Sequence, residues 1–380
     1  MRKKKLFVLS VILLAVVLSG CTGATAWPGL SATDEVAYLA HTTTVYAIDL
    51  KTHNQLWSFS GEKTGFTLLN TNPSMFISTP VVTSDGLVVI LDSSNKHVMY
   101  AVDPNDFNSS DRNPAPKVKW KFSQAGGLWI APPLEVGNLL FAPNSDGKVY
   151  VLDLTDGKSE KQAVEVIEVS QSSDGDSRLW AQPVTDGERL FITSLDKSVA
   201  AIDLATYQIL WKEDLGGAIP GGVALGGDGM LYVGSLAKQL ERFDPVTGEH
   251  QSVLDTNGWI WVTPVADGDN LYFADAEGYV YSYNTAEQRL NWEPVKPDSS
   301  ITANPLVLGD RVLFATESGS IFAFDTAGDF TEWFKPDQEG KAYTTPVSAG
   351  GVVLVAYLES DYYLAVLDQD GDQQWTFPNK

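Results

Sequence analysis

Short runs of alternating apolar and polar residues recur along the chain, and each run closes on an acidic or amide residue. The recurring segment holds an aromatic or aliphatic residue, a small residue, an aliphatic residue and then Asp or Asn, as in 46–49. The closing residues are Asp49, Asp103, Asp153, Asp203, Asp244, Asn284, Asp325 and Asp368. Because they lie 40 to 54 residues apart, the chain reads as eight copies of one unit.

Each unit contains four β-like stretches separated by turn residues. In the sixth copy, the stretches rich in aromatic and β-branched residues are 261–265, 271–274, 279–283 and 289–292. Asp-Gly pairs such as Asp267-Gly268 separate the stretches. Since no long segment of helical periodicity follows residue 20, the pattern predicts short strands throughout.

Two further residue types keep the same period. A proline precedes each closing residue by 20 to 24 positions, at Pro28, Pro80, Pro132, Pro183, Pro220, Pro264, Pro305 and Pro346. A tryptophan follows six of the closing residues, at Trp57, Trp120, Trp211, Trp292, Trp333 and Trp375. We expect the closing Asp to accept backbone N–H groups in the following turn, and the Trp to form a large apolar face between units.

Four short strands in a unit of about 40 residues are typical of a propeller blade. The expected fold of residues 27–380 is therefore all-β, an eight-bladed β-propeller of four-stranded antiparallel blades. A closed ring also covers strand edges that would otherwise invite aggregation. An exchanged terminal strand commonly closes such rings, but the even register of the units leaves open which segment would do so here.

The N-terminal 20 residues have the pattern of a secretory signal peptide. A basic segment at 2–5 precedes an apolar stretch at 6–18, which is too short for a membrane-spanning helix. The sequence Leu18-Ser19-Gly20-Cys21 then resembles the bacterial lipobox. That resemblance implies cleavage before Cys21 and acylation of its sulfur, with 21–26 as a lipidated tether. An uncleaved signal anchor or a free surface thiol are the alternatives.

Charge and cysteine content narrow the class of partner. The chain has a formal charge of −22, and losing the four basic residues of 1–20 makes the mature protein −26. A nucleic-acid backbone is therefore a poor partner. Anionic lipid headgroups would also repel this charge, so we expect contact with the membrane through the anchor rather than the domain surface. A single Cys excludes an internal disulfide and a Cys-rich metal site.

Motifs for catalysis or metal binding are missing from the sequence. His41, His53, His97 and His250 show no metal-ligand spacing. The segment 368–372 resembles the start of a calcium loop, but Asn379 stands where such a loop needs a bidentate Glu. We therefore predict no metal site, no catalytic residue and no cofactor, neither pyrroloquinoline quinone nor calcium.

Aromatic residues and inserts are the remaining candidates for function. Trp129, Trp180, Trp259 and Trp261 lie before or within first-strand segments, which line the channel of a propeller. They could stack on a sugar or quinone ring or pack between blades, and we favour packing. Inserts at about 60–78, 104–117 and 158–179 are polar and turn-rich, so they are expected to be exposed loops.

The repeat resembles the pyrroloquinoline-quinone-type propeller repeat, whose core is Ala-x-Asp-x-x-Thr-Gly-x-x-x-Trp. Ala47, Asp49, Thr52 and Trp57 match it, and His53 stands in the place of the Gly. A lipobox followed directly by one such propeller resembles the outer-membrane assembly factor B lipoproteins. That resemblance implies a non-enzymatic protein that binds a β-barrel assembly protein and helps insert outer-membrane proteins.

These features favour a lipid-anchored, monomeric scaffold of the bacterial cell envelope that binds another envelope protein. It would lie on the periplasmic face of the outer membrane in a diderm source, or on the outer face of the cytoplasmic membrane in a monoderm source. The alternatives are a quinone-dependent dehydrogenase and a propeller that binds an extracellular glycan or other ligand. The dehydrogenase is disfavoured because that family often carries a pair of adjacent cysteines, and the mature chain would have no free thiol.

Overall fold

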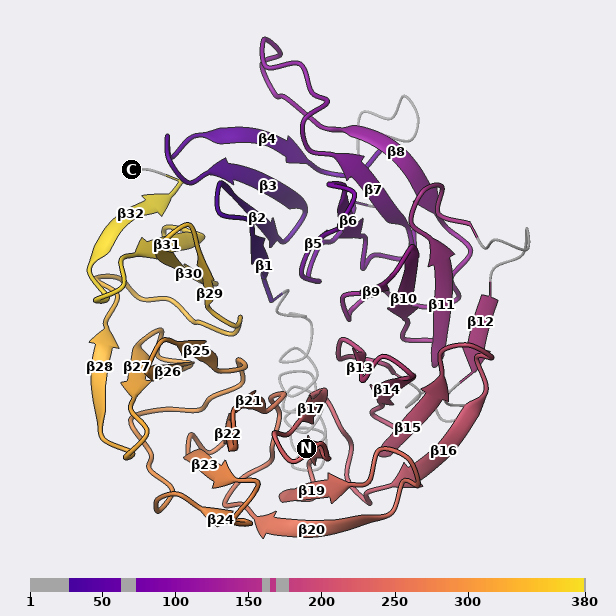
Figure 1. The fold of residues 1–380 in the computed structure, drawn as a ribbon. Coiled ribbons are helices and arrows are strands. Elements are labelled where there is room, and N and C mark those ends of the chain that lie inside the picture. The colour runs from indigo at the N-terminus through magenta and orange to yellow at the C-terminus, as the bar shows by residue number, and fades with distance from the viewer. Residues whose placement is uncertain (1–26, 63–72, 159–164, 169–177, 379–380) are drawn as a thin grey trace, which may run out of the picture.

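The computed structural model describes residues 27–62, 73–158, 165–168 and 178–378. In these residues the strands form eight four-stranded antiparallel sheets, arranged as blades around a central axis (Figure 1). The predicted eight-bladed propeller is therefore confirmed. Residues 1–26, with the predicted signal peptide, lipobox and tether, lie outside the described residues.

Every blade is a simple meander of four consecutive strands, the first nearest the axis. Blades 1 and 2 are β1 (Gly29–Ala32), β2 (Val36–His41), β3 (Thr44–Asp49), β4 (Gln55–Phe59), β5 (Val81–Val82), β6 (Val88–Leu91), β7 (Met99–Asp103) and β8 (Lys117–Phe122). Blades 3 and 4 are β9 (Leu134–Val136), β10 (Leu139–Pro143), β11 (Lys148–Asp153), β12 (Glu165–Glu168), β13 (Val184–Thr185), β14 (Arg189–Thr193), β15 (Ser198–Asp203) and β16 (Ile209–Asp214).

The second half of the ring repeats the arrangement. Blades 5 and 6 are β17 (Val223–Leu225), β18 (Leu231–Gly234), β19 (Gln239–Phe243), β20 (His250–Asp255), β21 (Val265–Asp267), β22 (Asn270–Ala274), β23 (Val280–Asn284) and β24 (Arg289–Leu290). Blades 7 and 8 are β25 (Leu306–Leu308), β26 (Arg311–Ala315), β27 (Ile321–Phe324), β28 (Phe330–Phe334), β29 (Val347–Ala349), β30 (Val352–Ala356), β31 (Leu364–Leu367) and β32 (Gln373–Phe377).

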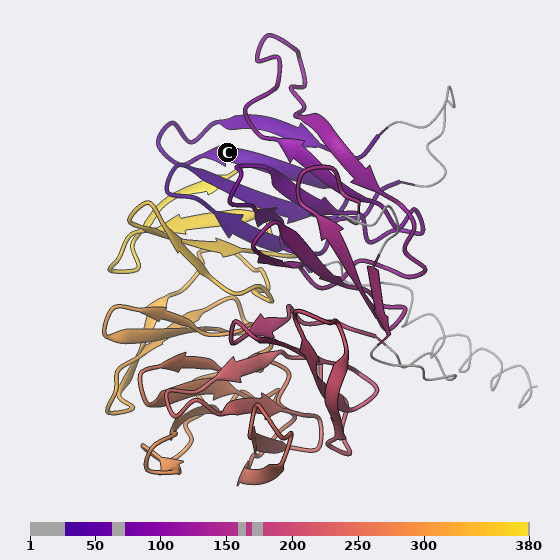
Figure 2. The ribbon, with the colours of Figure 1, turned by 45° about the vertical axis from the view of Figure 1, so that its right-hand side comes forward.

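The alternating strand directions give the ring two faces, which Figure 2 shows obliquely. The connection face carries the turns between second and third strands and the segments that join one blade to the next. The Asx-turn face carries the turns between first and second strands and those between third and fourth strands, each of which begins at a closing Asp or Asn.

The hydrophobic core lies between the blades. Each of the eight described clusters of buried apolar residues joins two neighbouring blades, as Phe243 and Trp211 join blades 5 and 4. Small residues at the repeat position, such as Ala47, Ala101 and Ala201, are fully buried and allow this close face-to-face approach. Burial between blades therefore holds the ring together.

The ring closes without strand exchange. Blade 1 is built entirely from β1–β4 and blade 8 entirely from β29–β32. Their shared cluster includes Leu30, Leu39 and Leu354. Asp34 accepts the backbone N–H of Gly350 at 3.0 Å, which adds a polar contact between the two ends of the chain. The closing interface is thus of the same kind as the other seven.

The prediction for the first strand of the sixth copy was wrong in its boundary. The sequence suggested 261–265, whereas β21 begins at Val265, after Pro264. A proline has no N–H for the strand ladder, so it stands before the strand rather than within it. The strand register also corrects three members of the proline series, in blades 1, 3 and 5. The residues equivalent to Pro264 in these blades are Leu30, Pro133 and Val223, rather than Pro28, Pro132 and Pro220.

The second insert packs on the neighbouring blade. Within 104–117, the carbonyl of Pro114 accepts the N–H of Ser58, a residue of the outer strand β4, at 2.9 Å. Lys119 of β8 pairs with Asp103 at 3.0 Å and so ties down the base of the same insert. This loop therefore covers an exposed strand edge in blade 1. Parts of the inserts 60–78 and 158–179 lie outside the described residues.

Candidate functional site

The eight closing residues of the repeat hold the turns of the Asx-turn face. Each side chain accepts at least one backbone N–H from two to four residues further along. Backbone N–H groups of Thr52 and Thr247 hold the pKa values of Asp49 and Asp244 below their usual range. Asn284 makes the same bond, to Glu287 at 2.7 Å, so the role requires an acceptor rather than a charge.

The repeat tryptophans lock each blade to the next. The indole N–H groups of Trp57, Trp120 and Trp211 donate to the carbonyls of Pro104, Leu154 and Pro245, at 3.0, 2.7 and 3.1 Å. Each acceptor directly follows the closing Asp of the next blade. This bond fixes the spacing between neighbouring blades at the Asx-turn face.

A glycine in the next blade's turn receives most of these indole rings. A Cβ added at Gly157, Gly248 or Gly328 would collide with Trp120, Trp211 or Trp292, and one at Gly371 would collide with Trp333. In blade 1, His53 occupies this place and stacks on Trp375. Buried indole nitrogens of Trp292 and Trp333 find no acceptor in the described residues. The closing residues and the tryptophans are therefore architectural, and a functional surface must be sought elsewhere.

The predicted lipidation residue Cys21 and the lipobox residues Leu18, Ser19 and Gly20 lie outside the described residues. The first described residue is Trp27, which lies two residues before β1, the innermost strand of blade 1, on the side of the connection face. The surface around this entry point is the candidate functional site.

Strand register identifies one equivalent residue on each path into a blade, which we call a hub residue. The eight hub residues are Trp27, Ile77, Ile130, Trp180, Pro220, Trp261, Thr302 and Tyr343. The residues directly before them, where described, are fully buried: Phe76, Trp129, Leu179, Ile219, Ile260, Ile301 and Ala342. The residue before each hub residue thus packs between blades, whereas the hub residues themselves, apart from the buried Pro220, are partly exposed.

Four aromatic hub residues meet across the ring. Trp27 stacks on Tyr343, with ring centroids 5.7 Å apart, and approaches Trp261 edge-on at 5.9 Å. Trp180 approaches Trp261 edge-on at 6.2 Å. Because these residues come from blades 1, 4, 6 and 8, they lie together near the axis. They contact one another rather than flanking a slot, which favours the packing interpretation over stacking on a quinone or sugar ring.

Hydrogen bonds between neighbouring blades support the hub. Thr263 Oγ1 accepts the N–H of Gly222 at 2.7 Å, and its own N–H donates to Asn304 Oδ1 at 2.7 Å. Gln182 Nε2 donates to the carbonyl of Pro133 at 2.9 Å. These bonds link blades 5, 6 and 7 and blades 3 and 4, so the hub is a rigid platform rather than a set of independent loops.

The two other tryptophans singled out in the sequence lie in different surroundings. Trp129 is fully buried between blades 2 and 3, and its indole N–H donates to the carbonyl of His97 at 3.0 Å. Trp259, two residues before the hub residue Trp261, is 53% exposed on the connection face. Its carbonyl accepts the N–H of Ala276 at 2.8 Å, which fixes the backbone beneath the exposed ring.

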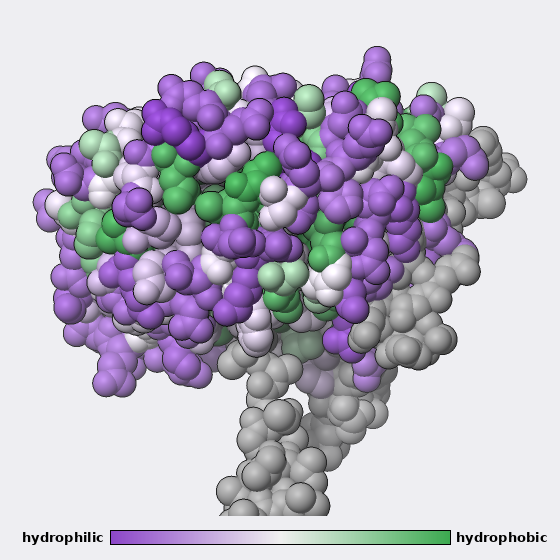
Figure 3. Space-filling view, turned by 90° about the horizontal axis from the view of Figure 1, so that it is seen from below, coloured by the Kyte–Doolittle hydropathy of each residue, from purple (hydrophilic) through white to green (hydrophobic). Residues whose placement is uncertain are grey.

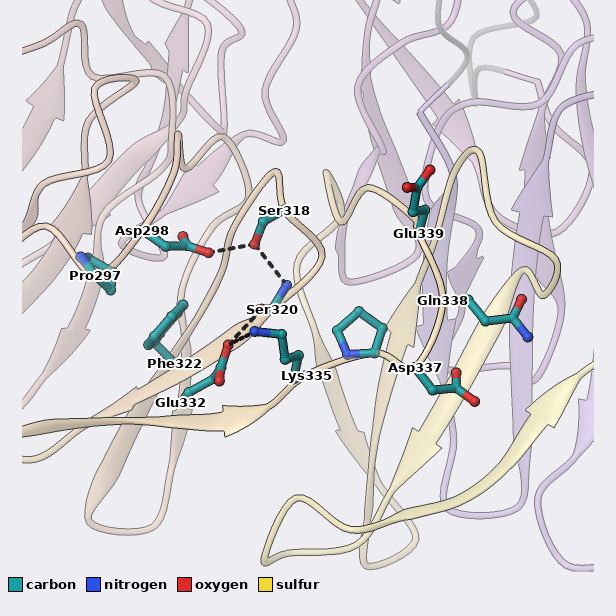
Figure 4. A pocket seen from close by; sticks show the side chains of 11 residues that line it. Pro297, Asp298, Ser318, Ser320, Phe322, Glu332, Lys335, Asp337, Gln338 and Glu339 are labelled. Atoms are coloured by element: carbon teal, nitrogen blue, oxygen red, sulfur yellow. Dashed lines mark hydrogen bonds and ion pairs between the residues drawn. The ribbon is translucent and has the colours of Figure 1, made fainter.

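The connection face also carries pockets between its turns. One of about 580 Å³ is lined by Asp298, Ser318, Glu332, Lys335 and Glu339 among others (Figure 4). Ser318 donates to Asp298 at 2.5 Å, and Lys335 pairs with Glu332 at 3.3 Å. Two of the carboxylates that line the pocket, those of Asp298 and Glu332, therefore already have partners within it. A second pocket, of about 410 Å³, lies beside His97, Asp146 and Arg178.

Metal-ligating groups do not converge in the described part of the chain, where no group of three or more His, Asp or Glu side chains could hold an ion. Oδ1 of Asp368, which opens the segment resembling a calcium loop, accepts the N–H groups of Asp370 and Asp372, and its Oδ2 accepts Gln374. Over the same described ranges, no helix has the length and apolarity to cross a membrane.

The outer wall of the ring is mainly hydrophilic, with apolar side chains in small groups, as the view from below shows (Figure 3). Among the described residues, the exposed large apolar side chains other than Trp259 all lie toward the Asx-turn face, either in its turns or at the strand ends that meet it. They are Ile209, Leu210, Leu225, Val246 and Phe330. On the connection face, by contrast, Trp259 is the one exposed large apolar side chain among the described residues.

Comparison with known proteins agrees with this architecture. The family described as outer membrane protein assembly factor BamB matches residues 23–251 and 195–333. The crystal structure of BamB from Moraxella catarrhalis is 17% identical, with a TM-score of 0.60 over 78% of this chain and 83% of that one. A computationally designed protein, Ika8, is 14% identical, with a TM-score of 0.63 over 93% and 96%. No curated protein matches the sequence. The structural likenesses show the fold alone.

Proposed function

This chain belongs to the family of the outer membrane protein assembly factor BamB, and we propose that it is a non-enzymatic, lipid-anchored scaffold that assists outer-membrane protein assembly. The observation that carries the proposal is the family match, which spans residues 23–333. The proposed location is the periplasmic face of the outer membrane, with acylated Cys21 as the anchor. The proposed partner is a β-barrel assembly protein of the same envelope.

The ring contacts of the hub support a binding role over a redox role. In a dehydrogenase, a planar cofactor would need a slot between two surfaces, whereas the rings of Trp27, Trp261 and Tyr343 contact one another. The rigid blades instead offer a large surface on which a protein partner can dock without rearrangement of the backbone. A scaffold needs this rigidity more than it needs a reactive group.

A direct binding experiment tests the proposal. The mature chain with Cys21→Ser, which cannot be acylated, is titrated with the purified periplasmic domains of the barrel-assembly protein from the same organism. We expect saturable binding with a Kd of about micromolar or tighter, corresponding to roughly −8 kcal/mol. No binding to those domains would overturn the proposed partner. Reduction of a redox dye with alcohols or sugars, after addition of pyrroloquinoline quinone and calcium, would overturn the non-enzymatic assignment.

The anchor has its own test. Mass spectrometry of the protein extracted from bacterial membranes is expected to find a mature N-terminus at Cys21 carrying acyl chains. Two or more chains would give stable anchoring, because a single chain binds a bilayer only marginally. An unmodified Cys21 in membrane-derived protein would contradict the anchored location without affecting the scaffold role.

A further inference from the structure

The point where the chain enters the propeller is fixed at the axis of the connection face. Trp27 is held by ring contacts to Trp261 of the path into blade 6 and to Tyr343 of the path into blade 8. The next residue, Pro28, accepts the hydroxyl of Thr344 at 2.5 Å through its carbonyl. Side chains from the paths into blades 6 and 8 therefore hold the start of the folded domain in one place.

The tether between Cys21 and Trp27 is short compared with the ring. The six residue steps between them reach roughly 20 Å when fully extended, at about 3.3–3.6 Å per residue. Around the outside of a blade, a path from the hub to the Asx-turn face crosses three strand spacings, about 14 Å, and then a strand of five residues, about 17 Å. This outer path is longer than the tether, and the contacting rings of Trp27, Trp180, Trp261 and Tyr343 lie on the direct path along the axis. An acylated Cys21 is therefore expected to stay on the side of the connection face.

We propose that the propeller lies with its connection face toward the bilayer, and that Trp259 contacts the lipid headgroup region. The inference rests on the acylated Cys21 of the proposed function and adds which surface meets the membrane. Indole rings suit this region, because they combine a broad apolar face with an N–H that stays hydrated. Trp259 alone among the described tryptophans is exposed, and it lies two residues from the hub.

Screening limits the repulsion between this face and anionic headgroups. In the turns between second and third strands, three lysines, Lys96, Lys197 and Lys238, are outnumbered by eight acidic residues. The acidic residues are Asp92, Asp146, Asp196, Asp275, Glu277, Glu317, Glu359 and Asp361, of which Asp92 and Asp275 are buried. Charges farther than about 8 Å from a headgroup are screened at physiological salt. Most of the charge of −26 is therefore screened from the membrane. In place of contact through the anchor alone, we expect the anchor and the connection face both to contact the membrane.

Thiol labelling provides the test, because the acylated mature chain has no free thiol of its own. Two matched pairs place one cysteine on each face: Trp259→Cys against Val246→Cys, and Lys197→Cys against Ala205→Cys. Trp259 and Val246 are 53% and 60% exposed, and Lys197 and Ala205 are both exposed in blade 4. The acylated variants are reconstituted into phosphatidylcholine vesicles that contain a minority of phosphatidylglycerol. The rate of reaction with a bulky polyethylene-glycol maleimide is then measured.

We expect the cysteines at 259 and 197 to react several-fold more slowly than those at 246 and 205 in the reconstituted protein. In the matching Cys21→Ser chains without lipid, both members of each pair should react equally fast. Equal rates in the fully acylated protein, or slower reaction at 246 and 205, would overturn the orientation alone. An unacylated Cys21 in the mass spectrum would overturn the anchor and the orientation together, while leaving the binding test of the scaffold role unaffected.

Contact by Trp259 is tested separately with brominated phosphatidylcholine, which quenches nearby indoles. Quenching of the acylated protein should decrease when Trp259 is replaced by Phe. A matched Trp211→Phe variant changes a tryptophan near the Asx-turn face and should retain the quenching. Identical quenching of the wild type and the Trp259→Phe variant would show that this ring does not reach the headgroups. Far-ultraviolet circular dichroism of every variant establishes that the fold is intact.

Discussion

The imidazole of His53 stacks on the indole of Trp375, with ring centroids 4.5 Å apart and planes inclined by 18°. The first residue lies in blade 1 and the second in blade 8, so this contact spans the closure of the ring. His53 occupies the turn position that glycine holds in other blades, and its φ of 62° lies in the left-handed region. In blade 1, the imidazole thus contacts the tryptophan ring where other blades place a glycine, and the backbone of His53 remains strained.

Substitution of His53 separates these two effects. His53→Ala loses the stacking and keeps the strain, so it should destabilise the fold by about 0.5–1.5 kcal/mol. His53→Gly loses the same stacking but relieves a left-handed strain of about 1–2 kcal/mol, so its net effect should be near zero. Urea denaturation of both variants checks the order. A Gly variant less stable than the Ala variant would contradict this account.

Two glycines of blade 5 form a matched pair for the Trp–turn contact. Gly248 and Gly229 have φ values of 76° and 75°, but a Cβ at Gly248 would lie 2.7 Å from Trp211, whereas one at Gly229 would meet nothing within 4 Å. Gly229→Ala should cost about 1–2 kcal/mol from backbone strain. Gly248→Ala should cost about 1–3 kcal/mol more from overpacking. Thermal unfolding of the two variants measures the difference, and equal losses would mean that the Trp211 ring yields freely.

The indole hydrogen bond between blades can be isolated with a second pair. Trp120→Phe leaves the carbonyl of Leu154 without its donor at 2.7 Å, which should cost about 1–3 kcal/mol beyond the loss of ring volume. Trp292→Phe removes a nitrogen that has no acceptor in the described residues, so only the volume term applies. Chemical denaturation should therefore find the Trp120 variant less stable than the Trp292 variant. The reverse order would show that volume, not the bond, dominates.

The closure of the ring should weaken on mild acidification because of His41. Burial lowers the pKa of its imidazole from the ordinary value of 6.5, against a smaller opposing contribution from a backbone hydrogen bond at Tyr357. The folded protein therefore binds a proton less readily than the unfolded chain. Stability from neutral His41 is complete above about pH 6.5 and decreases as the pH falls below it, by at most about 1.4 kcal/mol per pH unit.

Urea midpoints measured between about pH 7.5 and about pH 5.5 test this dependence, in a range where most carboxylates stay ionised. His41→Gln keeps a polar side chain that does not titrate, so its stability should vary less with pH than that of the wild type. Parallel pH profiles for the two proteins would show that another group governs the change. The ring of His41 stacks on that of Tyr363, with centroids 4.0 Å apart, and His41→Gln removes this contact as well. The Tyr363→Leu variant, which removes the stacking but keeps the imidazole, is therefore the control.

Most of the architecture could be predicted from the repeat, because the residues that define each unit interact with their neighbours in the sequence. An Asp followed by a turn makes bonds to residues two to four positions away, so the spacing of the closing residues was enough to count the blades. The tryptophan contact was partly predictable as well, since packing between blades requires a large apolar ring. Its acceptor was not, because the carbonyl of Leu154 lies in a different unit from Trp120.

The hub shows where sequence reasoning failed. Trp27 and Trp261 are far apart in the chain, and no local pattern reports that blades 1 and 6 face each other across an axis. The proline series also hid the hub, because Pro220 was aligned with Pro264 although the ladder makes it equivalent to Trp261. The apolar residue directly before each of these positions, Ile219 before Pro220 and Ile260 before Trp261, was a signal in the sequence that could have corrected the alignment.

Closure without strand exchange means that the ring has no topological beginning. Blades 1 and 8 meet through side chains alone, as any other pair does, and β32 ends on the same face on which β1 begins. A linker from one terminus to the other would follow the path of the seven natural connections, and a circular permutant opened within 215–222 would contain the same eight complete blades. The place where the chain starts thus decides only which blade lies next to the tether.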